Sequence, residues 1–449
     1  MKTKKQKINI VTLGCSKNIV DSERLMRQLT ANKIEVVHND NSTNAKTVII
    51  NTCGFINDAK EESIDTILEF AKAKTEGKID KLYVIGCLSE RYKEALKKDI
   101  PEADEYFGVN DLQKIVESLN IEYKINLLGE RVLTTPKHYA YLKISEGCNR
   151  TCSFCAIPVI RGRQVSKSLE ELEAEAKFLI SQGVKEIILI AQDLSSYGYD
   201  IYRTAMLPKL VQNLSSIEGL KWLRLHYTYP SNFPEELLDI MQKTNNICHY
   251  LDIPFQHITN NMLSAMKRGY DYNKTMQLIE LFRKKVPDIA LRTTLIVGHP
   301  NETEEDFEAL KKFVQEVKFE RLGVFTYSEE EGTFSAENYI DNIPEDEKNR
   351  RMEEIMNLQQ NISYELNQQK EGKILKVLID RLEANYFIGR TEFDSPEVDN
   401  EVLIENNMQT TQIEIGEFYN VEILRAEHFD LYGKIVELGI RNWELGVGN

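Results

Sequence analysis

Three cysteines lie within eight residues of this chain. Cys148, Cys152 and Cys155 stand in the stretch EGCNRTCSFCAIPVIRGR at the spacing C-x3-C-x2-C. Cysteine thiolates this close together usually bind a metal ion or an iron–sulfur cluster, and such centres normally have four protein ligands. A set of three leaves one position open. We therefore expect a four-iron cluster with one iron free to bind a small molecule, and zinc is the alternative that the motif alone leaves open.

Three further cysteines end short β-type runs in the first 90 residues. INIVTLGC ends at Cys15, TVIINTC at Cys53 and KLYVIGC at Cys87, so the cysteines are 38 and 34 residues apart. Each interval accommodates one strand–helix unit, with helices expected at 21–30 and 57–74. In a parallel doubly wound sheet the carboxyl ends of the strands meet at one edge. The three cysteines are therefore predicted to lie together, and small buried residues at strand ends are the alternative.

The elements that must position the first triad begin near Thr134. Helical stretches separate six β-type runs, at 139–145, 186–193, 222–229, 250–257, 291–298 and 321–328. Six strand–helix units are too few for a complete eight-stranded barrel, so an open, partial (βα)6 barrel is expected. Its active site should lie at the carboxyl ends of the strands.

A polar helix is expected over 344–370, and short strands separated by turns follow it. Short strands separated by turns predict a small antiparallel β-barrel at the C-terminus. The predicted fold class is thus α/β and multidomain, with a doubly wound parallel domain, a partial barrel and a small β-barrel. The boundaries we expect for these domains are 6–125, 134–366 and 368–440.

Bulk composition bears on three questions: nucleic-acid binding, membrane association and the redox compartment of the protein. Its 449 residues carry 56 Lys and Arg against 71 Asp and Glu, a formal charge of −15, which argues against a general nucleic-acid binder. No apolar run approaches the roughly 18 residues needed to cross a bilayer, so no membrane association is expected. Seven cysteines, an odd and clustered number, favour metal or redox use in a reducing cytoplasm.

The C-x3-C-x2-C motif at the start of a partial barrel, with aromatic Phe154 before its last cysteine, resembles the radical S-adenosylmethionine enzymes. This resemblance implies that the free iron binds the amino and carboxylate groups of S-adenosylmethionine. One electron would then cleave the cofactor to methionine and a 5′-deoxyadenosyl radical, which abstracts a hydrogen atom. Cys148, Cys152 and Cys155 would form the catalytic centre, and Phe154 would belong to the cofactor site.

The whole chain resembles a methylthiotransferase, a family that attaches a methylthio group and ends in a TRAM domain. This resemblance implies that Cys15, Cys53 and Cys87 hold a second 4Fe–4S cluster, also with three protein ligands. Its free iron would carry the sulfur to be inserted, methylated by a further S-adenosylmethionine. The two clusters would face each other across a domain boundary.

Four stretches, CSKNIVDSE, NTCGFINDAKEESI, GCLSERY and GRTEFDSPEVD, resemble the RimO type of this family. The resemblance implies methylthiolation of the β-carbon of one aspartate in ribosomal protein S twelve of the small subunit, giving 3-methylthioaspartate. The substrate would be the free protein or the assembled subunit, and an electron donor and a sulfur source would be needed. The alternative is a tRNA adenosine methylthiotransferase of the MiaB type, which typically has Gln-Met-Asn where this chain has Ser16-Lys17-Asn18.

The charge of the C-terminal region bears on this choice. Residues 371–449 contain 16 acidic and seven basic side chains. Phosphate backbones require a positive surface, so direct tRNA binding is disfavoured. An acidic barrel suits a basic protein such as a ribosomal one. The alternative is an acidic face that is merely solvated.

Two stretches at predicted strand ends offer further candidates for the cofactor site. Gln192 and Asp193 in AQDLSSYG are placed to reach the methionine part of S-adenosylmethionine, and a structural role is the alternative. Gly298 in LIVGHPNETEEDF lies in a stretch that resembles the adenine-contacting G-x-P-x-E-T of the family. His299 and Asn301 replace the usual Phe and Gly there, and Thr303 is a candidate helix cap.

The remaining polar candidates have weaker signals. Arg161 and Arg163 follow the cysteine loop and are placed to bind a carboxylate, with solvated loop arginines as the alternative. For His257 a structural role is favoured over a catalytic one, and Gln256 beside it has the same two interpretations. Cys248 belongs to neither triad and is expected to be a packing residue.

Overall fold

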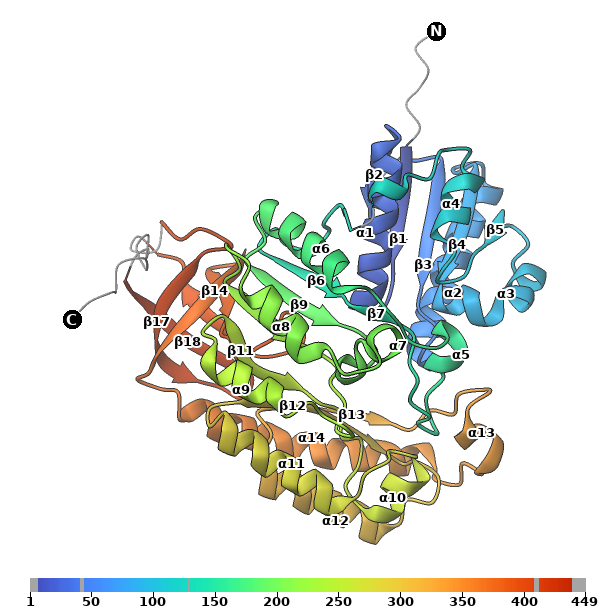
Figure 1. Cartoon of the computed structure of the whole chain (residues 1–449). Coiled ribbons are helices and arrows are strands. Elements are labelled where there is room, and N and C mark those ends of the chain that lie inside the picture. The colour runs from blue at the N-terminus through green and yellow to red at the C-terminus, as the bar shows by residue number, and fades with distance from the viewer. Residues whose placement is uncertain (1–6, 41–43, 128, 408–411, 438–449) are drawn as a thin grey trace.

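The computed structural model describes residues 7–40, 44–127, 129–407 and 412–437. Three parts of the chain follow one another in space as they do in sequence (Figure 1). Residue 6 and residues 438–440, which the predicted domain boundaries include, lie outside the described ranges. So do Arg441 and Glu444 of the C-terminal charge count.

The N-terminal region is a five-stranded parallel sheet in the order β2-β1-β3-β4-β5, with helices on both faces. The order changes direction between β1 and β3, and in doubly wound sheets the ligand-binding crevice lies at such a switch point. The strands are β1 (Lys7–Thr12), β2 (Glu35–His38), β3 (Thr47–Thr52), β4 (Lys81–Gly86) and β5 (Glu105–Tyr106). The helices are α1 (Ser16–Ala31), α2 (Asn57–Thr75), α3 (Cys87–Asp99) and α4 (Leu112–Ser118), followed by the short η1 (Ile125–Leu127).

Alternation of buried side chains explains why this sheet is covered on both faces. Ile8 and Ile10 of β1 pack with Leu25 of α1, whereas Val48 and Ile50 of β3 pack with other residues on the opposite face. Successive residues of a strand point to opposite faces, so a strand buried on both sides is apolar throughout. The sheet is thereby fixed between its helices, and all its strands end at one edge.

The central region is a six-stranded parallel sheet in the order β13-β12-β11-β10-β9-β6, as the predicted partial barrel requires. Its strands are β6 (Tyr139–Lys143), β9 (Glu186–Ile190), β10 (Trp222–Leu225), β11 (Ile247–Asp252), β12 (Ala290–Val297) and β13 (Arg321–Thr326). Its helices are α5 (Ile157–Arg161), α6 (Leu169–Ser181), α7 (Tyr199–Tyr202), α8 (Leu207–Ser215), α9 (Glu236–Lys243), α10 (Asn260–Ala265), α11 (Tyr272–Lys285), α12 (Glu304–Val317) and α13 (Phe334–Asn338), with the short η2 at Leu194–Ser196. A small ribbon, β7 (Ser145–Glu146) with β8 (Val165–Ser166), flanks the cysteine loop.

One set of strand side chains packs under the outer helices, and the other faces inward. The inward set includes Tyr139 and Tyr141 of β6 and Ile188 and Ile190 of β9, which contact Val20 of α1. The N-terminal region therefore packs against the inner face of the barrel. Within the described residues, no helix is long and apolar enough to cross a membrane.

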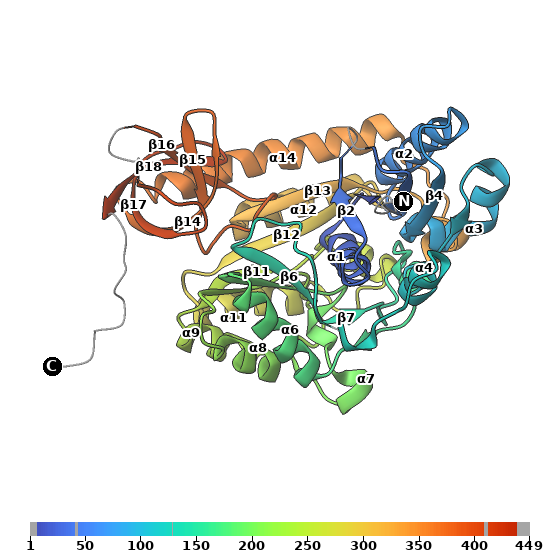
Figure 2. The same ribbon diagram turned by 90° about the horizontal axis from the view of Figure 1, so that it is seen from above.

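Helix α14 (Glu345–Gln368) links the central region to the C-terminal barrel. In Figure 2 it runs beside β13 from the side of α2 to the C-terminal strands. The closed barrel has the order β14-β15-β16-β18-β17, and its strands are β14 (Ile374–Glu383), β15 (Tyr386–Arg390), β16 (Glu401–Glu405), β17 (Phe418–Ala426) and β18 (Asp430–Glu437). The predicted antiparallel pairing holds except between β16 and β18, which run parallel.

Candidate active site

The N-terminal triad, Cys15, Cys53 and Cys87, lies where β1, β3 and β4 end. Cys53 and Cys87 are buried, whereas Cys15 is exposed on one side. Asn18 links the strand ends, because its Nδ2 donates to the carbonyl oxygens of Leu13 at 2.8 Å and Thr52 at 3.1 Å. Its Oδ1 lies 4.0 Å from the Cys87 Sγ. The structure therefore brings these three cysteines to one edge of the sheet, at its switch point.

Burial and charge act differently on the three thiols of this triad. Burial raises the pKa of Cys87 to about 12 and also raises the pKa of Cys53. Around Cys15 the crowding of protein atoms opposes ionisation, but the charges of Lys17 and Arg161 lower its pKa below the ordinary value. Cys15 is thus the thiol of this triad most easily converted to the thiolate that binds iron.

The core triad, Cys148, Cys152 and Cys155, occupies the loop between β7 and α5. The backbone N–H of Arg150 donates to the Cys148 Sγ at 3.4 Å. Arg268 donates from Nη1 to the Cys152 Sγ at 3.1 Å. Hydrogen bonds to cysteine sulfur stabilise the thiolate and tune the potential of an iron–sulfur cluster. This donor set fits a cluster bound through these three sulfurs.

Two thiols of the core triad are protonated in the absence of a metal. Burial raises the pKa of Cys148 to about 11 and that of Cys155 to about 12. Coordination by a metal ion displaces such protons, so assembly of the centre releases them. The neighbouring Tyr229 hydroxyl lies 3.6 Å from the Cys152 Sγ, and the Arg268 guanidinium packs over the Tyr229 ring at 4.4 Å.

The two triads are neighbours across the boundary between the N-terminal and central regions. Cys87 packs against Ala156 and Ile160 of the segment that follows Cys155. A second contact joins the regions nearby, where Arg91 binds Glu330 at 2.5 Å, one helical turn after Cys87. The two regions are therefore in direct contact beside both triads, and the facing of two clusters stays a prediction.

Within the described residues, no three His, Cys, Asp or Glu side chains are placed as they would be around a single metal ion.

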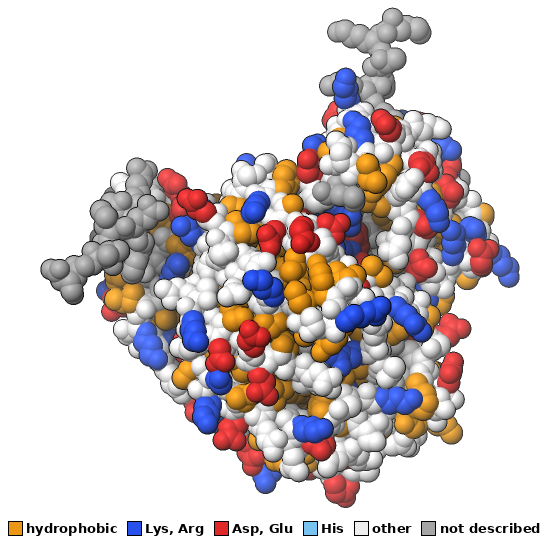
Figure 3. Space-filling model, in the orientation of Figure 1, with side chains coloured by type: hydrophobic (Ala, Val, Ile, Leu, Met, Phe, Trp, Pro, Cys, Tyr) orange, Lys and Arg blue, Asp and Glu red, His pale blue; other side chains and the backbone are white. Residues whose placement is uncertain are grey.

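A cavity of about 610 Å³ opens between the N-terminal and central regions beside the triads. Charged groups of both signs line it, among them Asp21 and Arg24 of α1 and Lys143 and Glu146 of the barrel. Figure 3 shows acidic and basic side chains gathered where this face of the molecule is hollowed. Lys143 forms ion pairs with both Asp21 and Glu146, so these charges join the two regions.

Sequence profiles of known families match the chain in three places. The Radical SAM superfamily matches residues 142–314, the Uncharacterized protein family UPF0004 matches residues 7–108, and the TRAM domain matches residues 372–436. Proteins called ribosomal protein uS12 methylthiotransferase RimO are similar over almost the whole length. The protein of Bacteroides thetaiotaomicron is 54% identical over 96% of this chain and 99% of its own, and that of Cytophaga hutchinsonii is 55% identical over 96% and 98%.

The chain belongs to the RimO methylthiotransferase family. Membership of the Radical SAM superfamily carries with it a 4Fe–4S cluster and S-adenosylmethionine. Among solved structures, the radical S-adenosylmethionine methyltransferase TsrM of Kitasatospora setae shares the fold. With cobalamin and a [4Fe-4S] cluster bound, it aligns with a TM-score of 0.53 at 15% identity over 86% of this chain and 81% of its own.

Two of the predicted cofactor residues already have partners in this RimO-family chain. Gln192 donates from Nε2 to Glu146 at 3.1 Å, and its Oε1 is buried without a partner within the described residues. Asp193 accepts from the Arg150 Nε at 2.7 Å and from the Ser195 backbone N–H. Asp193 thus orients an arginine of the cysteine loop, whereas the free oxygen of Gln192 is available to a ligand.

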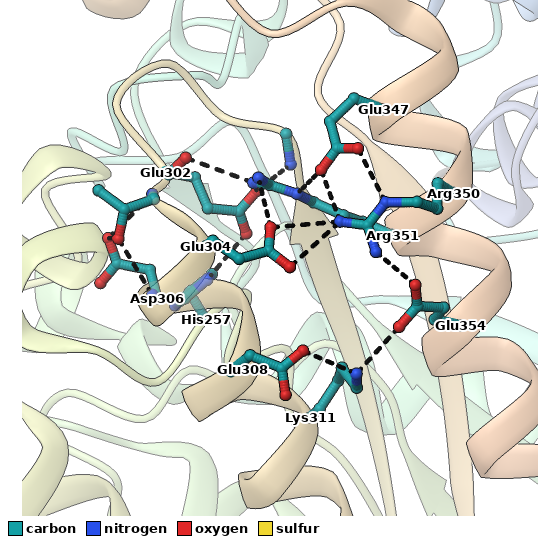
Figure 4. A network of polar contacts seen from close by, with 12 residues as sticks. His257, Glu302, Glu304, Asp306, Glu308, Lys311, Glu347, Arg350, Arg351 and Glu354 are labelled. Atoms are coloured by element: carbon teal, nitrogen blue, oxygen red, sulfur yellow. Dashed lines mark hydrogen bonds and ion pairs between the residues drawn. The ribbon is translucent and has the colours of Figure 1, made fainter.

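The Gly298 stretch is held by a polar network that reaches α14. Glu302 accepts from the Gly298 backbone N–H and from Arg351, and it pairs with His257 at 3.0 Å. Figure 4 shows His257 and Glu302 in this network, which extends to Glu347 and Arg350. His257 is fully buried in this network, and its structural role stays a prediction. Thr303 forms the predicted cap, in a capping box with Asp306.

Other candidates are placed as follows. Phe154 is half-buried in the cysteine loop, and Arg163 is exposed beside it. Gln256 has a left-handed backbone, φ 72°, and lies four residues after the end of β11. His299 is buried and bonds to Ser335 at 3.0 Å. Cys248 is buried beside Trp222, as expected of a packing residue.

Part of the acidity of the C-terminal region lies in ion pairs with the central region. Several of its carboxylates bind cations or imidazole of the central region, and the side chains of Asp394 and Asp399 are only 1% exposed. These groups stabilise docking between the two regions, and among them the side chain of Glu417 is about half exposed. The pairs are Asp380 with His138, Asp394 with Arg321, Asp399 with Arg292 and Glu417 with Lys185.

Sequence reasoning missed the side chains that surround the core triad. Arg268 and Tyr229 lie 116 and 77 residues from Cys152 and contact its sulfur. Neither stands in a recognisable motif. The one available signal was position, because Tyr229 ends the third predicted barrel strand, 222–229, where active-site residues are expected.

Proposed function

We propose that this RimO-family chain attaches a methylthio group to the β-carbon of one aspartate of ribosomal protein uS12, giving 3-methylthioaspartate. The observation that carries the proposal is the similarity to RimO proteins at 54% identity over 96% of the chain. The meeting of Cys15, Cys53 and Cys87 beside the core triad supports it, because the reaction needs a sulfur carrier next to a radical source.

The two triads would hold one 4Fe–4S cluster each. Cys148, Cys152 and Cys155 would bind the cluster that supplies the 5′-deoxyadenosyl radical from S-adenosylmethionine. The N-terminal triad would bind the cluster that supplies the sulfur. Phe154, Gln192 and Gly298 are our candidates for contacts to S-adenosylmethionine.

The surrounding residues of the chain would bind and orient these groups. Arg268 holds the Cys152 sulfur by a hydrogen bond and is itself fixed, because it also donates to the Pro254 carbonyl. The free oxygen of Gln192 can accept a hydrogen bond at the carboxyl end of β9. Cys87 packs on Ala156 and Ile160, so the boundary beside the two triads is apolar at this point.

The activity would need partners beyond the chain. These are an electron donor, a sulfur source and uS12, either free or in the assembled small subunit. We place the reaction in the cytoplasm, where the cluster thiols stay reduced. Acidic side chains such as Glu383 and Glu414 are exposed on the C-terminal barrel, which suits contact with a basic substrate.

An anaerobic assay tests the proposal. The full chain would be reconstituted with iron and sulfide and reduced with dithionite in the presence of S-adenosylmethionine. Formation of 5′-deoxyadenosine and the mass of a uS12 peptide would then be followed with and without uS12. A methylthio mass gain on one aspartate supports the proposal. Formation of 5′-deoxyadenosine with modification of tRNA instead of uS12 would move the chain to the MiaB type.

A further inference from the structure

Arg161 ends α5, six residues after the last cysteine of the core triad, yet its guanidinium points into the N-terminal region. It is 4% exposed. Its Nη2 donates to the Asn18 Oδ1 at 2.7 Å, and its Nη1 donates to the Glu146 Oε1 at 2.8 Å. Asn18 is the residue that links the strand ends of the N-terminal triad, so Arg161 is joined directly to the frame of that triad.

The positive charge of Arg161 acts on the N-terminal triad. The Asn18 Oδ1 that accepts from Arg161 lies 4.0 Å from the Cys87 Sγ, so the guanidinium is one side chain away from that sulfur. The arginine that contacts a sulfur of the core triad is a different one, Arg268, which donates to the Cys152 Sγ at 3.1 Å. Each triad thus has its own arginine, and the one beside the N-terminal triad comes from the central region.

We propose that Arg161 is a positioning residue that completes the N-terminal cluster site from the central region, holding α1 against α5 and raising the reduction potential of that cluster. This inference rests on the proposed function, because it requires a cluster at the N-terminal triad. The reduced cluster carries one more negative charge than the oxidised one. Arg161 balances the carboxylates of Glu146 and Asp21, with which it forms ion pairs, and its buried positive charge favours the reduced state.

The test isolates the N-terminal cluster in the full-length protein. A background variant with Cys148→Ala, Cys152→Ala and Cys155→Ala leaves only the N-terminal triad to bind iron. Its midpoint potential would be measured by electron paramagnetic resonance during a redox titration. Adding Arg161→Gln should shift the potential to a more negative value, because the cation is lost. Arg161→Lys should restore part of the shift, and Arg163→Gln, at the exposed neighbour, should leave the potential at its original value.

The same measurement on the core cluster separates an electrostatic role of Arg161 from a purely structural one. In the background Cys15→Ala, Cys53→Ala and Cys87→Ala, the potential of the core cluster should shift with Arg268→Gln and stay constant with Arg161→Gln. Thermal unfolding of each variant would check that the fold persists. If the Arg161→Gln variant binds about four irons and the potential of its N-terminal cluster is unchanged, the inference about Arg161 is wrong. The proposed two-cluster function is then unaffected. Absence of iron from the N-terminal triad would overturn the proposed two-cluster function as well.

Discussion

The core triad is built by one loop, whereas the N-terminal triad is built by three strand ends. Within eight residues the core loop supplies all its cysteines and a backbone N–H that bonds to one of them. The N-terminal triad gathers residues that are 72 positions apart, and it takes its arginine from another region of the molecule. The geometry of the first centre is therefore mostly local. The second depends on a folded sheet and on the docking of two regions.

The largest expected effect comes from Cys152→Ala in the core triad. Removing this ligand should abolish formation of 5′-deoxyadenosine and methylthiolation together, because both begin with cleavage of S-adenosylmethionine. Iron content should fall from about eight to about four per chain, since each triad holds one four-iron cluster. Iron analysis and chromatography of the nucleoside product check this. Cleavage at the wild-type rate would show that the core triad is not the radical source.

Cys53→Ala, in the N-terminal triad, should separate the two activities. Iron content should again fall to about four per chain, but reductive cleavage of S-adenosylmethionine should continue at the core triad. Methylthiolation of the uS12 peptide should be lost, because the sulfur carrier is missing. Mass spectrometry of the peptide, run beside the nucleoside assay, gives both readouts. A variant that loses both products would mean that the two centres do not assemble independently.

A smaller effect is expected from the glycine that precedes the first cysteine of each triad. A Cβ at Gly14 (φ +84°) would lie 2.6 Å from the Cys53 Cβ, and one at Gly147 (φ +74°) would lie 2.3 Å from the Arg163 carbonyl oxygen. Gly14→Ala should therefore displace a ligand of the N-terminal cluster and lower methylthiolation more than cleavage. Gly147→Ala should distort the core loop and lower both.

The measurement for this pair is the ratio of methylthiolated peptide to 5′-deoxyadenosine, together with urea unfolding. Each substitution should cost about 1–3 kcal/mol of unfolding free energy, from backbone strain and crowding. We expect the ratio to be lower than wild type in Gly14→Ala and equal to wild type in Gly147→Ala, which would show that the two triads fail in different ways. The same ratio in both variants would mean that the two triads do not differ in this respect.

The same contrast explains how far the sequence could be interpreted. Spacing alone identified the core triad, because its ligands are local. The N-terminal triad followed from topology, since parallel strands end at one edge. Arg161 was noticed, but as a carboxylate binder, and its contact with Asn18 arises only when the two regions dock. Charge counting did not reveal the ion pairs of the C-terminal barrel, because composition does not show that Asp394 is paired with a buried arginine.

Thr303 supports the fold but contacts neither triad. Its variant therefore shows what a loss of stability alone does to iron content and activity. Thr303→Ala removes the side chain that caps α12, where the Thr303 Oγ1 accepts from the Asp306 backbone N–H at 3.2 Å. Loss of such a cap should cost about 1 kcal/mol of unfolding free energy. Iron content and both products should stay at wild-type levels, since the cap lies on the outer layer of the barrel. Thr303→Ser, which keeps a hydroxyl, is the matched control.

The result for Thr303→Ala decides how losses in the cysteine and glycine variants are attributed. If a loss of about 1 kcal/mol leaves both centres intact, then a variant of similar stability that loses iron has lost it at the cluster. If Thr303→Ala itself lowers cleavage, the neighbouring Glu302, which binds the Gly298 backbone N–H, transmits the change to the barrel mouth. The core centre would then depend on a distant helix after all, and the contrast between a local and an assembled triad would be one of degree.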